Sequence, residues 1–419
     1  MRRLSTYFLM IFLCLIVILF ISCDDSDTTT TESTTNNITY EYKITYELDG
    51  GTNSENNPAE YKTGDTVSLD FPTKEGYMFA GWYEDSNFTT FVREINEREE
   101  DIILYAKWAA YEDIFEFTKI VDGYSVQIAP DYEVGVIIIP SQYNGLPVIE
   151  ITRTAEKHHK LFKAVIISDT VTSINLQAFS NGMDKDMEMC LEYIGVDENN
   201  PNYKSVDGIL YSKDGKTLMR YPASKNGDAF KIPEGVTTID HYAFSRNENL
   251  KSITIPNSVI SIGECVFNRA VSLESIVIPN SVEKIGGYAF EKCISLKNIT
   301  LSNNIESIEY YTFDRCTALE SIIIPNSVKS IGAWAFSSCS ALKSIVISDS
   351  VSAIHVGAFN KCTSVEKIII PKNVVEMDGS AFQDCPQITL YCEAEIMPEG
   401  WESHLKKNVK EVIWGYKGE

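Results

Sequence analysis

A motif of 23 residues recurs without a break through the C-terminal half of this sequence. Seven phenylalanines mark it, and neighbouring ones always lie 23 positions apart: Phe244, Phe267, Phe290, Phe313, Phe336, Phe359 and Phe382. An unbroken period of this length indicates one structural unit stacked many times, because each unit buries its apolar face only against the next. The sequence therefore predicts a mainly β solenoid rather than a compact globule.

Each copy of the motif contains one short strand pattern. The clearest copy spells L-x-x-I-x-I from Leu273 to Ile278, which is typical of a strand with alternating buried side chains. Val282, Ile285 and Phe290 then turn the chain around the back of the coil. Stacked copies place their strands in a parallel sheet with about 4.8 Å between neighbours. Side chains at equivalent positions therefore form rows along the stack.

One such row consists of cysteines, three positions after each phenylalanine: Cys293, Cys316, Cys339, Cys362 and Cys385. Small buried side chains that fill a tight turn explain it, and Ala270 at the same position one repeat earlier indicates that a methyl group suffices. Disulfides between adjacent coils are the alternative, because the coil spacing overlaps the Cα separation that they need. Cys385 and Cys392 are a further candidate pair.

A second row, the charge row, alternates in sign at every repeat: Asp228, Lys251, Glu274, Lys297, Glu320, Lys343 and Glu366. Opposite charges on neighbouring strands stabilise a sheet by roughly 0.2–1 kcal/mol per pair. The charge row therefore favours register and solubility, and it neutralises itself, which makes it a poor site for a charged ligand.

A third row alternates with the core positions and is expected to point outward: Ile166, Lys231, Thr254, Val277, Thr300, Ile323, Val346 and Ile369. It becomes apolar toward its C-terminal end. An exposed stripe of this kind predicts a docking strip for a protein partner, with Ile323, Val346 and Ile369 as candidate contacts. Ordinary strand propensity on a wetted face is the alternative interpretation.

One insertion interrupts the period. Phe179 and Phe244 lie 65 positions apart, which leaves 42 residues beyond one repeat. Within residues 183–228, two strand patterns flank Asp214-Gly215 and predict a β-hairpin. We expect four of its side chains to be exposed and to be candidate partner contacts, of the types that dominate binding sites: Tyr203, Tyr211, Arg220 and Tyr221. A purely structural hairpin is the alternative.

The repeat consensus C-x-x-L-x-x-I-x-I-P-x-x-V-x-x-I-G-x-x-A-F, over residues 161–387, resembles the BspA-like leucine-rich repeats of bacterial surface proteins. The resemblance implies a right-handed leucine-rich-repeat solenoid with a parallel sheet. It also implies an extracellular adhesin or protein-recognition surface without catalytic residues. Because a solenoid must cover its open ends, residues 110–160 are interpreted as an N-terminal cap or degenerate repeat and residues 388–419 as a C-terminal cap.

A separate small unit is expected at residues 42–109. Its GYMFAGWY from Gly76 to Tyr83 and its YAKW from Tyr105 to Trp108 resemble the Listeria-Bacteroides repeat of bacterial surface proteins, which implies a β-grasp-like domain. A unit this small must close its core with large aromatic side chains. The alternative to core packing is a sugar-stacking platform formed by Trp82, Tyr83 and Trp108.

The N-terminus reads as an export signal. Residues 1–22 have two arginines followed by an apolar run from Tyr7 to Ile21, as in a lipoprotein signal peptide. FISC, ending at Cys23, resembles a bacterial lipobox, which implies lipid attachment at Cys23. Residues 23–41, rich in Thr, Ser and Asp, are expected to form a disordered tether. The alternative is an uncleaved membrane anchor, since the apolar run is nearly long enough to span a bilayer.

The net charge and the absence of known catalytic motifs disfavour several classes of function. The 419-residue chain has a net charge of −23, which opposes binding to nucleic acid. It has five histidines and lacks H-E-x-x-H, G-x-S-x-G and EF-hand patterns, so no cofactor, metal site or catalytic residue is predicted. We expect a non-catalytic adhesion module on the extracellular face of the bacterial membrane, lipid-anchored, with an extracellular or host protein, or a glycan, as partner. The alternatives are a surface-anchored carbohydrate-active hydrolase and a passive coat or spacer protein.

Overall fold

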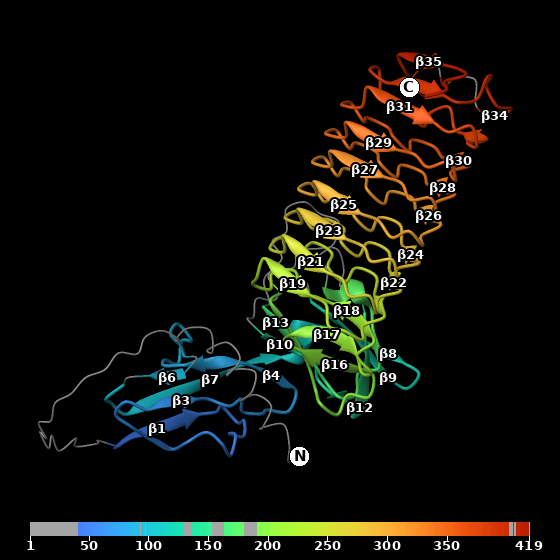
Figure 1. Ribbon diagram of the computed structural model, residues 1–419. Helices are drawn as coiled ribbons and strands as arrows, with labels where there is room; N and C mark the ends of the chain where they lie inside the picture. The colour runs from blue at the N-terminus through green and yellow to red at the C-terminus, as the bar shows by residue number, and fades with distance from the viewer. Residues whose placement is uncertain are drawn as a thin grey trace, which may run out of the picture. The chain divides into compact units, whose positions relative to one another are not determined.

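The computed structural model describes residues 41–92, 94–96, 98–129, 136–152, 163–179, 191–401, 405 and 408–418. The chain divides into two compact units, the first ending at Glu116 and the second beginning at Phe117. Nearly all regular structure is β, and the second unit is a stack of short strands (Figure 1). The predicted fold class is therefore confirmed. The predicted signal peptide, Cys23 and nearly all of the predicted tether lie outside the described residues.

The N-terminal unit is built on one mixed five-stranded sheet in the order β2-β1-β7-β4-β5. Its members are β1 (Glu41–Glu47), β2 (Glu60–Lys62), β4 (Tyr77–Tyr83), β5 (Phe91–Val92) and β7 (Ile102–Ala110). The remaining elements are β3 (Thr66–Ser68), which pairs with β6 (Glu94–Asn96), and the short helix α2 (Tyr111–Ile114). β1 and β7 pair in parallel at the centre of the sheet.

Aromatic side chains form the core of this unit. Trp82 is only 2% exposed and packs edge-on against Phe79, with 5.2 Å between ring centroids. Trp108 also packs against Phe79, and its indole Nε1 donates a hydrogen bond to the Leu48 carbonyl oxygen at 2.8 Å. These contacts support the interpretation of both tryptophans as core residues rather than as a sugar-binding platform.

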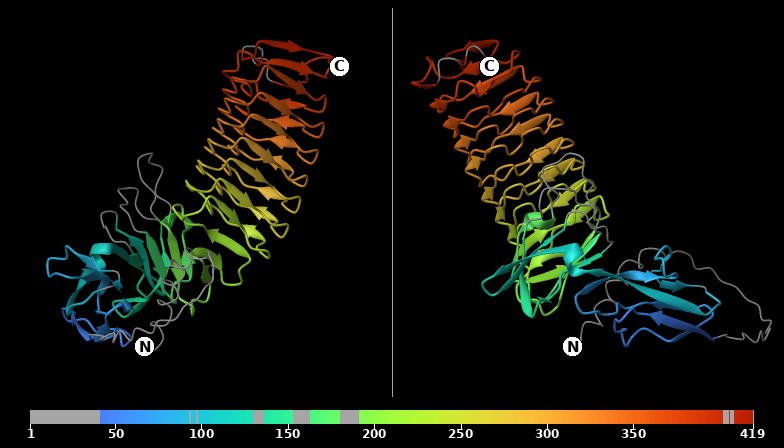
Figure 2. Two further views of the ribbon diagram at one scale, coloured as in Figure 1. Left: turned by 60° about the vertical axis from the view of Figure 1, so that its left-hand side comes forward. Right: turned by 180° about the vertical axis from the view of Figure 1, so that it is seen from behind.

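Each coil of the solenoid contributes one strand to each of two opposite faces (Figure 2). We call the face with the longer strands the first face. Its strands are β10 (Val136–Ile138), β13 (Ala164–Ile167), β15 (Tyr193–Val196), β19 (Ala229–Lys231), β21 (Ser252–Thr254), β23 (Ser275–Val277), β25 (Asn298–Thr300), β27 (Ser321–Ile323), β29 (Ser344–Val346), β31 (Lys367–Ile370), β33 (Thr389–Cys392) and β35 (Glu411–Ile413).

The second face carries strands of two residues in the regular coils: β20 (Thr238–Ile239), β22 (Ser261–Ile262), β24 (Lys284–Ile285), β26 (Ser307–Ile308), β28 (Ser330–Ile331), β30 (Ala353–Ile354), β32 (Glu376–Met377) and β34 (Gly400–Trp401). Strands pair in parallel with residues one repeat apart, for example Ile253 with Ile276. The sequence period is thus reproduced as register, and the predicted rows exist.

The repeat phenylalanines form a continuous stack of rings between the two faces. All seven, from Phe244 to Phe382, are fully buried. Neighbouring ring centroids lie 5.0–5.4 Å apart with planes inclined by 2–19°. Offset or stacked aromatic pairs are worth about 0.5–1.5 kcal/mol beyond their area burial, so this spine couples every coil to the next.

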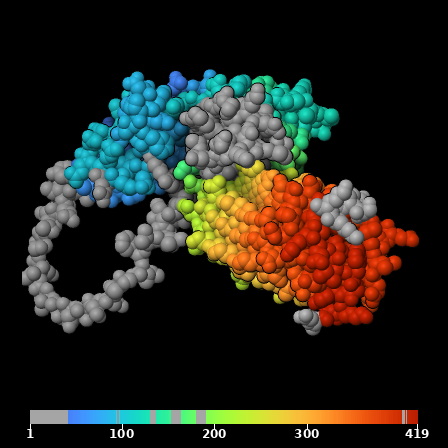
Figure 3. Space-filling model, turned by 90° about the horizontal axis from the view of Figure 1, so that it is seen from above, coloured from blue at the N-terminus to red at the C-terminus, as the bar shows by residue number. Residues whose placement is uncertain are grey.

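Both ends of the solenoid are modified coils. At the N-terminal end, β8 (Phe115–Ile120), β9 (Gly123–Ile128), β11 (Gln142–Tyr143) and β12 (Leu146–Ile151) form a sheet, and β14 (Ser173–Ile174) pairs with β12. The 3₁₀ turn η1 (Leu176–Phe179) follows. The C-terminal end of the solenoid is the red surface in Figure 3. There the Trp401 indole Nε1 donates a hydrogen bond to the Val374 carbonyl oxygen, and the Trp401 ring packs against Trp414.

The insertion forms the predicted hairpin, but it is not an appendage. β16 (Tyr203–Val206) pairs antiparallel with β17 (Ile209–Ser212), and β17 pairs antiparallel with β18 (Thr217–Arg220). β18 then pairs in parallel with β20. The hairpin therefore extends the second face of the solenoid. Because of this placement, the aromatic and cationic side chains of the hairpin pack against the solenoid.

The expectation that the four insertion side chains are exposed was wrong. They are 0–9% exposed: Tyr203, Tyr211, Arg220 and Tyr221. Tyr221 stacks on Phe244 with 5.3 Å between centroids and so begins the aromatic spine. Arg220 then occupies the inward position that Ala243 takes one coil later. Its guanidinium donates to the carbonyl oxygens of Phe179 and Ser245, and burial lowers the pKa of Arg220 to about 10.

Candidate interaction surface

The first face presents an exposed apolar row, as predicted. Its members are Val277, Ile323, Val346 and Ile369, which are 62%, 70%, 53% and 39% exposed. The exposed Thr300 stands between Val277 and Ile323, so the uninterrupted apolar part runs from Ile323 to Ile369. Their neighbours along each strand point inward, because side chains alternate between the two sides of a strand. Ile322 and Ile345, for example, are 3% and 7% exposed. We call these four residues the apolar row.

The apolar row continues into the C-terminal cap with an aromatic residue. Ile369 pairs with Tyr391 in the sheet, and Tyr391 pairs with Ile413. The Lys367 ammonium lies 4.4 Å from the Tyr391 ring centroid and donates to the Tyr416 hydroxyl at 3.3 Å. The strict 23-residue period does not reach this cluster, because Tyr391 lies 22 rather than 23 positions after Ile369. A search that tolerates one missing residue finds it.

The charge row lies on the same face and pairs across coils. The Lys–carboxylate distances are 3.8 Å for Lys251–Asp228, 3.6 Å for Lys297–Glu274 and 3.5 Å for Lys343–Glu320. All of these side chains are at least half exposed, so each pair contributes at most about 1 kcal/mol. Between the charge row and the apolar row runs a row of small exposed polar residues, the serine row: Ser252, Ser275, Asn298, Ser321 and Ser344.

A second stack of aromatic rings lies at the turn two residues before each phenylalanine. Tyr288 stacks on Tyr311 at 4.8 Å, and Tyr311 on Trp334 at 6.2 Å. All three have left-handed φ values of 53–58°, which is unfavourable for bulky residues. Within the stack the facing rings cover one another, so both faces of the middle ring, Tyr311, are occupied. The stack stabilises the strained turns, and its 23-residue spacing was visible in the sequence.

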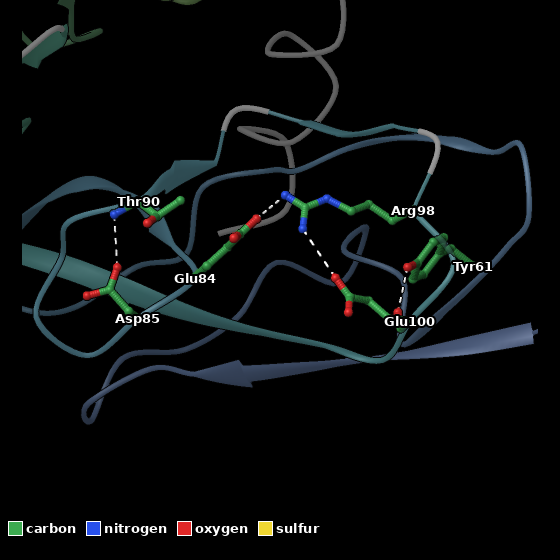
Figure 4. A network of polar contacts seen from close by, with 6 residues as sticks. All are labelled: Tyr61, Glu84, Asp85, Thr90, Arg98 and Glu100. Atoms are coloured by element: carbon green, nitrogen blue, oxygen red, sulfur yellow. Dashed lines mark hydrogen bonds and ion pairs between the residues drawn. The ribbon is translucent and has the colours of Figure 1, made fainter.

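A polar network in the N-terminal unit closes its turns (Figure 4). Arg98 bridges Glu84 and Glu100, and the Tyr61 hydroxyl donates to the Glu100 carbonyl oxygen at 2.6 Å. The carboxylates of Glu84 and Glu100 are thus paired with a cation. They do not form a free acid–base pair of the kind that glycoside hydrolysis needs.

A shallow, open hollow lies on the described surface. It is lined by Asn175, Gln177, His241 and Tyr242. His241 Nδ1 accepts a hydrogen bond from the Glu264 backbone amide at 3.1 Å, so this nitrogen of the imidazole is bound to the backbone of the next coil. Within this part of the chain, no group of three or more His, Cys, Asp or Glu side chains is placed to hold a metal ion.

No helix among the described residues is both long and apolar enough to cross a membrane. The apolar run from Tyr7 to Ile21 lies outside those residues. Cys23, the expected lipid attachment site, also lies outside them, so its role stays a prediction.

Comparisons with known proteins agree with this architecture. Residues 223–278 and 261–389 match the family described as BspA type leucine-rich repeat region, in six copies, and residues 42–107 match the Listeria-Bacteroides repeat domain. A leucine-rich repeat protein from Eubacterium ventriosum ATCC 27560 has a similar structure, with a TM-score of 0.52 and 27% identity. The similarity covers 59% of this chain and 64% of that one.

Two curated relatives come from Evansella cellulosilytica. They are a "putative Gly-rich membrane protein" and a "putative membrane protein", 39% and 38% identical to this chain over 77 residues. The matches cover 18% of this chain but only 9% and 11% of those proteins. The chain therefore spans about a tenth of the length of these relatives.

Proposed function

Because the chain carries a BspA type leucine-rich repeat region and a Listeria-Bacteroides repeat domain, we propose that it is a bacterial cell-surface protein that binds another protein without catalysing a reaction. The observation that carries the proposal is the apolar row on the first face, with Ile323 70% exposed. Contiguous exposed apolar side chains on a soluble protein mark interaction sites.

The composition of the first face supports docking of a protein. Burial of apolar surface contributes about 25 cal/mol per Å², and the apolar row supplies that surface along several adjacent coils. The charge row beside it is already paired and exposed, as expected of the polar rim of an interface. The Lys367–Tyr391–Tyr416 cluster adds an aromatic side chain of a kind enriched among residues that dominate binding energy.

The finer part of the proposal is the attachment to the cell. Residues 1–22 direct export, Cys23 carries the lipid, and residues 23–41 hold the folded units away from the membrane on its extracellular face. Two acyl chains at one residue anchor a protein firmly, whereas a single chain binds only reversibly. Cys23→Ala is expected to abolish incorporation of labelled fatty acid. Unchanged labelling contradicts the anchor.

The binding proposal is tested with the full chain displayed on cells. We expect binding to at least one member of a panel of extracellular matrix and cell-surface proteins. Ile323→Lys/Val346→Lys/Ile369→Lys is expected to weaken it at least about tenfold, because each lysine must be desolvated in the interface. The matched control is Ile260→Lys/Ile294→Lys/Val375→Lys, which changes residues that are 48%, 48% and 53% exposed outside the apolar row. Equal binding by both variants contradicts the proposal.

A further inference from the structure

The apolar row has a fixed spacing along the solenoid, and this spacing constrains what binds there. Neighbouring strands in a sheet lie about 4.8 Å apart, and the stacked phenylalanines beneath them repeat at 5.0–5.4 Å. A partner that follows the row must present one apolar side chain per coil at this interval.

An α-helix meets this requirement and a β-strand does not. The helix has a pitch of about 5.4 Å, and the apolar stripe of an amphipathic helix recurs once per turn. Over the four steps from Val277 to Ile369, a helix departs from the coil spacing by only about 2 Å. The same-side residues of a strand recur at about 6.7 Å, which accumulates a mismatch of about 8 Å over that length.

We propose that the partner places an amphipathic α-helix along the apolar row, parallel to the long axis of the solenoid. This inference rests on the proposed function, since it specifies the partner that the first face binds. The serine row lies beside the apolar row and consists of small side chains, such as Ser321 and Ser344. It allows the helix to approach the sheet while the apolar row fills the spaces between its turns, as ridges of one helix fill grooves of another.

The charge row supplies complementarity along the edge of the same helix. The charge row, serine row and apolar row span four strand positions, which is about 10 Å and close to the diameter of a helix with its side chains. A helix seated on the serine row therefore has one flank over alternating charges, such as Glu320 and Lys343. Alternating acidic and basic residues on that flank match the sign at each coil and set the register of the helix.

The chemistry of the apolar row disfavours a glycan in this position. Sugar recognition relies on flat aromatic faces, whereas Ile323, Val346 and Ile369 are branched aliphatic side chains. Tyr391 at the end of the row already receives the Lys367 ammonium over its ring. A protein helix with leucine-like side chains makes better use of such a surface, because the gain comes from the apolar area buried.

The test is a selection on the full chain from three probe sets. The first is a display library of amphipathic helices of about 21 residues with apolar residues at heptad positions a and d. The second is a library of equal length with alternating apolar and polar residues, and the third is a glycan array. Every clone is measured against the parent, Ile323→Lys/Val346→Lys and the control Ile260→Lys/Val375→Lys. Circular dichroism verifies that all three proteins have the same fold, which is expected because the replaced side chains are exposed.

We expect clones from the helix library that lose at least about tenfold in affinity on Ile323→Lys/Val346→Lys and keep it on the control. Lysine scanning of those clones is expected to show losses at i, i+3 or i+4, and i+7. Binding that depends on the apolar row but comes only from the alternating library or the glycan array overturns the helix inference and leaves the row as a binding surface. If no probe of any kind depends on the row, the inference and the proposed protein-binding function both fail.

Discussion

At the residue scale, each side chain of the cysteine row forms a hydrogen bond to the backbone of the preceding coil. Each thiol donates a hydrogen bond to the carbonyl oxygen of the phenylalanine 26 positions earlier, as from Cys316 to Phe290 at 3.1 Å. All seven cysteines in the described part of the chain are free, including Cys385 and Cys392. This supports small buried thiols over disulfides between coils. Burial raises the pKa of the row, to about 11 for Cys385.

Thiol accessibility tests this assignment. Because the thiolate is the reactive form, the native protein is expected to leave the five thiols of the cysteine row unreactive toward an aromatic disulfide reagent at pH 8. Unfolding in denaturant without reductant is expected to expose all five. Fewer than five newly reactive thiols contradict the assignment and favour disulfides. Cys316→Ala is expected to cost about 1 kcal/mol, measured by urea unfolding, since it removes one hydrogen bond and leaves a small cavity.

Asp85 illustrates a residue whose charge holds a loop. Its carboxylate accepts a hydrogen bond from the backbone amide of Thr90, shown in Figure 4, and others from the amides of Thr89 and Asn87. These bonds lower the pKa of Asp85. A carboxyl whose pKa is lower in the folded state stabilises the fold above its unfolded pKa of about 3.9. That contribution is lost as the pH falls through the folded pKa.

The expected consequence is a pH-dependent effect of Asp85→Asn. At pH 7 the variant is expected to melt at a lower temperature than the parent. The neutral side-chain amide of Asn accepts weaker hydrogen bonds from the three backbone N–H groups than the ionised carboxylate does. The difference in Tm, followed by circular dichroism, is expected to shrink as the pH falls below 4. A difference that stays constant down to pH 2.5 contradicts the role of the ionised carboxylate.

At the scale of elements, the charge row acts between neighbouring strands. Glu320→Lys places a third positive charge beside Lys297 and Lys343 and is expected to cost roughly 0.5–1 kcal/mol, because like charges on adjacent strands repel. Adding Lys343→Glu and Glu366→Lys to this variant restores the alternation from position 320 onward and is expected to recover part of the loss. Urea unfolding measures both, and the effect should weaken in 1 M salt, where the screening length is about 3 Å. Equal costs for the single and triple variants contradict the pairing.

At the scale of the whole molecule, the aromatic spine makes stability depend on position along the stack. Phe313 lies between the rings of Phe290 and Phe336, whereas Phe382 ends the row against Phe359. In a solenoid each coil contacts mainly its neighbours. A loss in the middle therefore weakens two interfaces, and a loss at the end frees only the last coils.

Alanine substitutions test this arrangement. Phe313→Ala is expected to cost about 3–5 kcal/mol in the unfolding of the stack. Phe382→Ala is expected to increase hydrogen exchange chiefly in the coils after β31, because local opening there leaves the remaining coils paired. Hydrogen exchange followed by mass spectrometry separates the two patterns. Uniform loss of protection in both variants contradicts nearest-neighbour coupling.

The sequence by itself determined the regular part of this protein. A repeated unit copies its own pattern of buried and exposed positions, so the phenylalanine spine, the cysteine row and the outward apolar row followed from one motif. The outward direction of Ile323, for example, needed only the alternation of a strand and the stacking of coils.

Only the tertiary structure decided what happens where the period breaks. Between Phe179 and Phe244 the period alone does not say where the extra residues stand. If they follow one repeat, Tyr221 lies outside the spine. If they precede it, Tyr221 lies one period before Phe244 and joins the spine. The strand pairing of β18 with β20 selects the second, which buries Arg220 and Tyr221. Burial at such positions depends on contacts between distant segments, which a local pattern does not specify.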